Sequence, residues 1–263
     1  MDTRDSTARF SNRVADYVKY RPSYPAALRD ALVHDVGIVA DSIVADVGSG
    51  TGISTDLLRQ IGCTVYAVEP NADMRQAAEQ RFAGDACVHS VNGRAEATGL
   101  EDASVDAIVA GQAFHWFTRA ETRREFARIL RPGGTLSIFW NVRQTDTTPF
   151  LRAYEALHRE YGTDYAEIHH VMSDDELRLF FGDAHETRTF AYEQVLDFES
   201  VSGRLTSSSY VPHAGHPNFE PMIAALRRIF DAHAEDGRVR VLYDTELYFG
   251  VLAPTAAPRS ASS

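Results

Sequence analysis

The segment from Ile43 to Gly52, IVADVGSGTG, constrains the fold of this chain more than any other. It joins an apolar, strand-like run to three glycines at alternate positions, the first two being Gly48 and Gly50. Because glycine has no Cβ, such a loop can turn sharply with positive φ angles and bring its backbone close to a ligand. The stretch 53–61 has apolar residues at helical spacing, so we expect the loop to open onto a helix N-terminus, which favours electron-rich ligand atoms.

The spacing of the glycines separates two classes of cofactor site. The dinucleotide fingerprint G-x-G-x-x-G does not fit, because the third glycine comes one residue early, and no Walker lysine follows the loop. A second strand-like run, 64–68, ends at Glu69. An acid at the tip of the second strand suits hydrogen bonds from a ribose diol. The two segments together predict the first half of a doubly wound, nucleotide-type unit.

Strand-like and helix-like segments alternate in the next part of the chain. We expect strands at 86–90, 105–110 and 135–140, and helices at 74–82 and 121–130. Consecutive strands that are separated by helices of this length form parallel neighbours. The alternation therefore predicts an α/β fold with a mostly parallel sheet and helices on both faces.

The regular alternation of strands and helices ends after residue 140. We expect helices at 149–161 and 173–181, a strand at 186–196, a further helix at 219–234 and a closing strand within 239–252. These helices interrupt the alternation and therefore predict a helical insertion. The end of the chain is rich in Ala, Ser and Pro, a composition typical of disordered tails.

Five segments carry a family resemblance. VADVGSGTG, VYAVEPN, NGRAEATGL, VDAIVAGQAFHWF and ILRPGGTLSIFW resemble, in this order, the core motifs of the class I S-adenosylmethionine-dependent methyltransferases. The likeness covers roughly residues 10 to 145. The opening FSNRVADYVKYRPSYP and the phrase QAFHWF are similar to the small-molecule group that includes the trans-aconitate methyltransferases. The resemblance implies a Rossmann-like, seven-stranded sheet and methyl transfer to an O, N, C or S atom of a small molecule.

The resemblance also implies how the chain is divided. A single methyltransferase domain would span residues 1–252, followed by a disordered tail at 253–263. Within the domain we expect an N-terminal arm or lid at 1–40, a cofactor-binding core at 41–145 and a substrate-side helical region at 146–235.

The family motifs imply a set of cofactor-binding residues. They are Asp46, Gly48, Ser49, Gly50, Gly52, Glu69, Pro70, Met74, Ala95, Glu96, Gln112 and Arg21. The glycine loop would approach the methionine part of S-adenosylmethionine, Glu69 would accept the ribose hydroxyls, and the Ala95–Glu96 loop would meet the purine edge. Two alternatives stay open: Asp46 can order the loop instead of touching the cofactor, and Met74 can be core filling.

Candidate catalytic residues follow the fourth strand and lie in the N-terminal arm. They are His115, Trp116 and Tyr20. Transfer from a sulfonium depends mainly on in-line positioning and exclusion of water, so His115 would orient or deprotonate the acceptor and Trp116 would wall off solvent. Alternatively, Trp116 starts a helix as a core residue. An aromatic lid would be formed by Tyr17, Tyr20, Arg21 and Tyr24, and an ordinary capping arm is the rival interpretation.

Composition excludes several other classes of function. A formal net charge of -11 argues against a nucleic-acid substrate. The two cysteines show no C-x-x-C spacing, and the histidine pairs at 169–170 and 213–216 lack a coherent set of acids or cysteines, so we expect no disulfide framework and no metal site. No apolar run reaches membrane-spanning length, and no signal peptide is evident. We therefore expect a cytoplasmic monomer or homodimer whose partner is a small-molecule acceptor.

Two other functions remain open at this point. A noncatalytic protein could keep the same fold for S-adenosylmethionine binding or partner assembly, and a nicotinamide enzyme is a weaker alternative, which the early third glycine disfavours. The acceptor is not identified by the sequence. If it carries a carboxylate, Arg21, Arg143 or Arg204 could bind it, and the sequence does not rank them.

Overall fold

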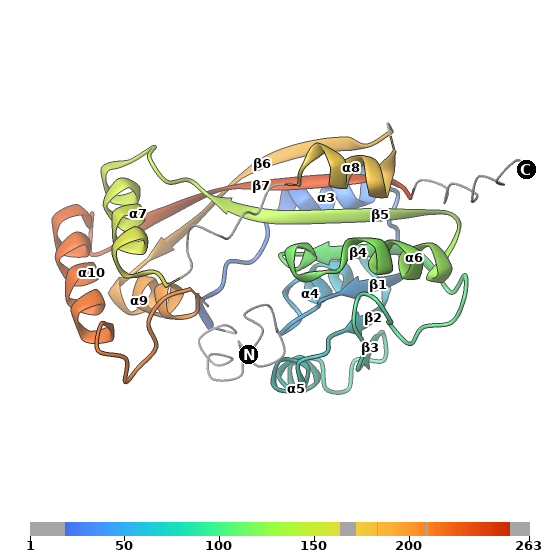
Figure 1. Cartoon of the computed structure of the whole chain (residues 1–263), viewed down its shortest axis with the longest axis horizontal. Helices are drawn as coiled ribbons and strands as arrows, with labels where there is room; N and C mark the ends of the chain where they lie inside the picture. The colour runs from blue at the N-terminus through green and yellow to red at the C-terminus, as the bar shows by residue number, and fades with distance from the viewer. Residues whose placement is uncertain (1–18, 164–171, 183, 209, 253–263) are drawn as a thin grey trace, which may run out of the picture.

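Seven strands form one mixed sheet, which runs across Figure 1 in the order β3-β2-β1-β4-β5-β7-β6. The computed structural model describes residues 19–163, 172–182, 184–208 and 210–252. The strands are β1 Ile43–Val47, β2 Thr64–Val68, β3 Val88–Val91, β4 Val105–Gly111, β5 Leu130–Arg143, β6 Glu186–Leu196 and β7 Val239–Val251. Pairing from β3 through β5 is parallel, whereas β7 is antiparallel to both β5 and β6. The expected doubly wound, mostly parallel seven-stranded sheet is confirmed.

Helices cover both faces of the parallel part. They are α3 Ala26–His34, α4 Ile53–Ile61, α5 Ala72–Arg81, α6 Arg119–Ile129 and α8 Asp174–Phe181. Successive strand residues point to opposite faces, so Val44 of β1 packs with the α3–α4 side and Ala45 with the α6–α8 side. Because each face has its own apolar cluster, the central parallel strands β1 and β4 consist mostly of apolar residues.

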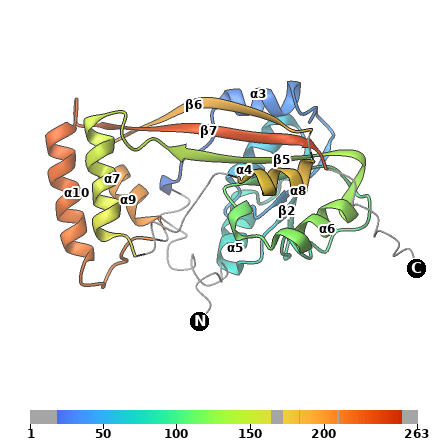
Figure 2. The same cartoon turned by 45° about the horizontal axis from the view of Figure 1, so that its top comes forward.

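A third apolar cluster lies at the far end of the long strands β5, β6 and β7 (Figures 1 and 2). It is built on three helices, α7 Pro149–Tyr161, α9 Phe198–Thr206 and α10 Phe219–His233, together with the outer parts of β6 and β7. The segment 146–235, expected to be helical, thus contains two kinds of element. Its α7, α9 and α10 form this cluster, whereas its α8 packs beside α6 and its β6 is the sheet edge.

Local sequence signals explain most element boundaries. The Ser173 hydroxyl and the Glu176 carboxylate form a capping box at the start of α8. Helix α9 is the element that periodicity did not indicate, although the side chain of Asp197 accepts a hydrogen bond from the Ser200 N–H at its N-terminus, a signal present in the sequence. Over the described ranges, none of the helices combines the length and the apolar character needed to cross a bilayer.

Candidate active site

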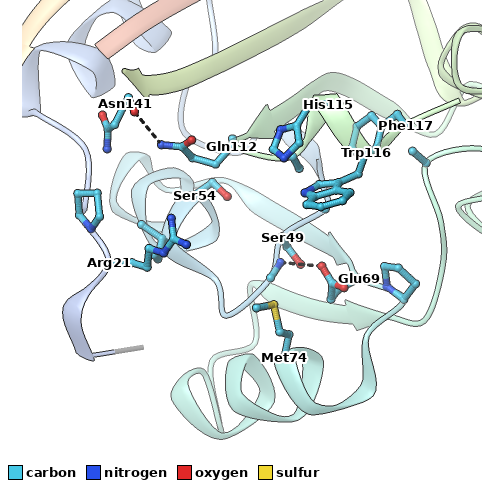
Figure 3. Close-up of a pocket in the computed structure, with 18 of the residues that line it drawn as sticks. Arg21, Ser49, Ser54, Glu69, Met74, Gln112, His115, Trp116, Phe117 and Asn141 are labelled. Carbon is cyan, nitrogen blue, oxygen red and sulfur yellow. Dashed lines mark hydrogen bonds between the residues drawn. The ribbon is translucent and has the colours of Figure 1, made fainter. Parts of the chain in front are cut away.

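A cavity of about 240 Å³ opens where β1, β2 and β4 end, at the carboxyl edge of the sheet. Open α/β sheets bind their ligands at this edge, where loops leave opposite faces of the sheet. Figure 3 shows that side chains from the loops after these strands converge on it, together with the N-terminal arm. Most of the expected site residues line it, namely Arg21, Gly48, Ser49, Gly50, Glu69, Pro70, Met74, Ala95, Glu96, Gln112, His115 and Trp116.

The glycine loop packs tightly between β1 and α4. Gly48 has a φ of +73°, and a Cβ built on it would lie 2.5 Å from the Cβ of Ala113, so the loop tolerates no side chain there. Gly50 has a φ of +56° and borders the cavity near the Met74 sulfur. The third glycine, Gly52, caps α4 against the ring of Phe82 and does not line the cavity. Its contribution is to the shape of the turn.

Glu69 joins the tip of β2 to the glycine loop. Its Oε2 accepts the Gly50 N–H at 2.9 Å, and its Oε1 accepts the Asn71 N–H at 2.8 Å. Burial raises the pKa of this carboxyl, and the two backbone N–H groups oppose that shift. Each carboxylate oxygen can accept a further hydrogen bond. The acid is therefore held so that it can still receive a diol from the cavity side.

These residues fit S-adenosylmethionine. The Ser49 hydroxyl is buried in the cavity wall and has no hydrogen-bond partner within the described part of the chain, which leaves it available to a polar ligand atom. Met74 is buried beside Gly50 and lines the cavity, a position compatible both with the expected apolar cofactor contact and with core filling. Glu96 also has a structural partner, because its Oε1 accepts the Thr118 N–H at 2.7 Å at the start of α6.

Asp46 lies behind the loop, not in the cavity. It is fully buried, and its carboxylate accepts the hydroxyl hydrogens of Ser54 and Thr55 in the first turn of α4. Burial raises its pKa to about 6, against the effect of those two hydroxyls. Of the two roles considered for Asp46, the geometry supports ordering of the loop and the helix start.

The raised pKa of Asp46 predicts a pH effect on stability. The folded state holds the proton more tightly than the unfolded chain, so the contribution is fully present below about pH 4 and is lost as the pH rises through about 6. A shift from 3.8 to about 6 corresponds to about 3 kcal/mol. As the pH is raised from 4 to 7, the free energy of unfolding of the wild type should fall by about 3 kcal/mol relative to that of Asp46→Asn, because the asparagine does not titrate. Urea titrations of both proteins at several pH values measure this difference. An unchanged difference across this range would contradict the prediction.

A short 3₁₀ helix after β4, Phe114–Trp116, presents the candidate catalytic residues. Phe114 is buried and meets the rings of Trp140 and Phe180, which anchors the turn and leaves His115 and Trp116 lining the cavity. Arg119, which the sequence did not single out, donates hydrogen bonds to the carbonyl oxygens of Phe114 and Phe117 at 2.6 Å and so fixes this turn.

Gln112 adopts a strained backbone conformation beside this turn. Its φ is +58°, an unusual value for a residue other than glycine. Its Nε2 donates a long hydrogen bond of 3.5 Å to the Asn141 carbonyl across the cavity wall (Figure 3). Strain of this kind concentrates at ligand sites. It supports the expectation that Gln112 is a site residue.

The N-terminal arm crosses the cavity and is bound to α9. Arg21 lines the cavity, and its Nη2 donates to the Ser207 carbonyl at 2.9 Å. Tyr20 does not line the cavity: its ring occupies the space that Gly203 leaves by having no Cβ, and its hydroxyl donates to Glu199. The geometry thus supports the lid but gives Tyr20 no access to reacting atoms. Tyr17, a further residue of the expected lid, lies outside the described residues.

Several polar residues that were not in the expected set also line the cavity, among them Asn141, Arg143 and Arg204. Asn141 and Arg143 come from the end of β5, and Arg204 comes from α9. The sequence suggested the two arginines only as alternatives for binding a carboxylate. An arginine between Gly203 and Leu205 belongs to no motif, and its position follows only from the way α9 packs. His213 and His216 are outside the lining, and no cluster suited to a metal ion is found among the described residues.

Comparison with known proteins finds similarity to methyltransferases in part of the chain. Residues 45–138 match the family model described as "Methyltransferase domain". An uncharacterized methyltransferase of Mycobacterium tuberculosis is 40% identical over 144 residues, which are 53% of this chain and 55% of that protein. An uncharacterized methyltransferase-like protein of Schizosaccharomyces pombe is 33% identical over 156 residues, 59% of each chain. The chain therefore aligns with less than two thirds of the length of these relatives.

A solved structure shares the overall fold. A putative type II methyltransferase from Anaeromyxobacter dehalogenans superimposes with a TM-score of 0.66 at 24% identity, and the match covers 90% of this chain and 100% of that one. The likeness thus includes the region after residue 140, which the family match does not reach.

Proposed function

We propose that this chain, whose residues 45–138 match the family model described as "Methyltransferase domain", transfers a methyl group from S-adenosylmethionine to a small molecule. The observation that carries the proposal is the Glu69–Gly50 hydrogen bond, because it holds an acid suited to a ribose diol directly against the glycine loop of the same cavity. S-adenosylmethionine supplies the methyl carbon and the sulfonium leaving group. The chain has to bind the cofactor and the acceptor, align the acceptor atom with the methyl carbon, and exclude water.

The roles of the residues follow from their positions. The glycine loop and the Ser49 hydroxyl would hold the methionine part, Glu69 the ribose, and the loop with Ala95 and Glu96 the purine. Trp116 would exclude water, and His115 would orient the acceptor or take its proton where that proton has a high pKa. No triad is needed, since alignment supplies most of the rate gain.

Two features support a small acceptor. The arm and α9 close over the cavity through the Arg21–Ser207 hydrogen bond, so a large polymer would have to displace them. The net charge of -11 disfavours nucleic acid. The narrower likeness to the trans-aconitate methyltransferases stays a prediction, and an assay with trans-aconitate as the acceptor tests it.

Calorimetric titration with S-adenosylmethionine and with NADH, followed by incubation of the protein with methyl-labelled cofactor and a fractionated cell extract, tests the proposal. We expect binding of S-adenosylmethionine but not of NADH, and transfer of label to a small product. Binding without any labelled product would favour the noncatalytic alternative. Preference for NADH would contradict the cofactor assignment.

A further inference from the structure

Arg204 occupies an unusual position in the cavity wall. It lies on α9, lines the cavity and is only 9% exposed. Within the described residues, no carboxylate lies within ion-pair distance of its guanidinium. Its surroundings include the phenol groups of Tyr154, Tyr210 and Tyr243. A desolvated cation without a counter-charge is costly to a fold and is retained mainly where it serves a ligand.

The other arginines of the cavity provide the contrast. Arg143 is nearly as buried, but its Nη2 lies 2.7 Å from the Glu155 carboxylate. Arg94 is largely exposed and faces Glu96 at 3.7 Å. Both of these positive charges are therefore already balanced by an acid. Arg21, the fourth arginine of the cavity lining, is only half-buried, and its Nη2 donates to the Ser207 carbonyl. Arg204 is thus the more deeply buried cation with capacity for an incoming anion.

The guanidinium of Arg204 is held in one orientation. Its Nε donates to the Tyr243 hydroxyl at 3.2 Å, and its Nη1 donates to the Ser208 hydroxyl at 3.2 Å. The Tyr243 hydroxyl donates in turn to Gln194 at 2.8 Å, which fixes the tyrosine. The remaining nitrogen, Nη2, carries two more N–H groups and makes no hydrogen bond to the described residues. A fixed guanidinium with free donors is preorganised for an oxyanion.

The position of Arg204 assigns that oxyanion to the acceptor. Glu69 and the glycine loop, which would hold the cofactor, follow β1 and β2, whereas α9 packs in the helix cluster at the far end of the long strands (Figure 1). We propose that Arg204 is the docking point for an oxyanion group, a carboxylate or a phosphate monoester, on the methyl acceptor. The anchored group is not the methylated atom; it fixes the acceptor so that another atom faces the methyl donor. This inference rests on the proposed function.

An acceptor panel tests the substrate class. Purified full-length protein and S-adenosylmethionine are incubated with small carboxylic acids, with phosphate monoesters and with the primary amides that match the acids, and release of S-adenosylhomocysteine is measured. We expect transfer to at least one acid or one phosphate monoester, and at least 100-fold slower transfer to the uncharged counterpart. The class of compound that is methylated, carboxylic acid or phosphate monoester, identifies the anion.

Variants test the residue. With the responding acceptor, Arg204→Gln should lower kcat/KM about 100-fold, mainly through KM, because a charge-assisted contact is lost. Arg204→Lys should recover part of the loss, since it keeps the charge but not the planar fork. Arg240→Gln removes an exposed arginine of β7 and should change nothing. The melting temperature of Arg204→Gln should equal or exceed that of the wild type, because a structural arginine would lower it on removal.

The contradicting outcomes are distinct. If Arg204→Gln weakens S-adenosylmethionine binding as much as acceptor use, the arginine serves the cofactor carboxylate and the inference is wrong. If the wild type methylates the uncharged amides as fast as the matching acids, or if Arg204→Gln leaves kcat/KM for the acid unchanged, the oxyanion site is wrong while methyl transfer stands. If the protein binds the cofactor and methylates neither the panel nor a cell extract, the proposed function itself fails.

Discussion

Glu69→Ala is expected to weaken S-adenosylmethionine binding by roughly 1,000-fold. Two hydrogen bonds from a ribose diol to a carboxylate contribute about 1.5–3 kcal/mol each, and both disappear with the side chain. The same change removes the acceptors of the Gly50 and Asn71 N–H groups, so the glycine loop also loses its link to β2. Isothermal titration measures the affinity, and circular dichroism establishes that the variant is folded.

Two further variants sharpen this measurement. Glu69→Gln keeps the shape and one acceptor oxygen but loses the charge, and we expect it to lie between the wild type and Glu69→Ala. Glu79→Ala removes an exposed acid from the adjacent helix α5 and should leave the affinity unchanged. An affinity for Glu69→Ala within threefold of the wild type would show that the ribose is held elsewhere.

Gly48→Ala is expected to lower the free energy of unfolding by roughly 4 kcal/mol. Part of this cost comes from the φ of +73°, which L-residues adopt at a cost of about 1–2 kcal/mol. The rest comes from overlap, because the new Cβ would lie 2.5 Å from the Ala113 Cβ and 3.3 Å from the Phe117 ring, and overpacking costs about 1–3 kcal/mol. Since Ala113 precedes the turn with His115, relief of the overlap would also displace the candidate catalytic residues.

Gly237→Ala is the matched control for this substitution. Gly237 has a similar φ of +69°, but a Cβ there would meet no atom within 4 Å. Gly237→Ala should therefore lower the free energy of unfolding only by the backbone contribution of about 1–2 kcal/mol. Urea titrations of both variants separate the two contributions by subtraction, and equal losses would contradict the steric argument at Gly48.

The fold was accessible from the sequence because its strongest determinants are local. Alternation of apolar strands with amphipathic helices predicts the parallel part, and the bounds expected for β2, α4 and α7 agree with the structure. The Thr148 and Asn71 side chains cap α7 and α5 through their own nearby N–H groups, so these boundaries depend on short-range chemistry. Within the 146–235 segment the strand expected at 186–196 agrees with β6, whereas helix α9 and the packing of α8 beside α6 depend on tertiary structure and were not predicted.

The site could be predicted only where a motif carries it. Gly48, Glu69 and His115 stand at strand ends, where the topology alone brings them together. Arg204 and Asn141 reach the same cavity through the docking of α9 and through the length of β5, which no short motif encodes. For Tyr20 the sequence predicted a site residue that the cavity lining does not contain. Tyr20 is adjacent to Arg21 in sequence, but its ring packs against Gly203 and not against the cavity.

The separate apolar cluster around α7, α9 and α10 has a consequence for how this protein can diversify. Its core residues, among them Leu151, Leu205 and Leu226, are not shared with the clusters that support the cofactor loops. Stability changes at sites with no common neighbours add almost independently. Substitutions that reshape this helix cluster can therefore accumulate without destabilising the half that carries the glycine loop and Glu69, so the chain offers engineers two modules that can be optimised one at a time.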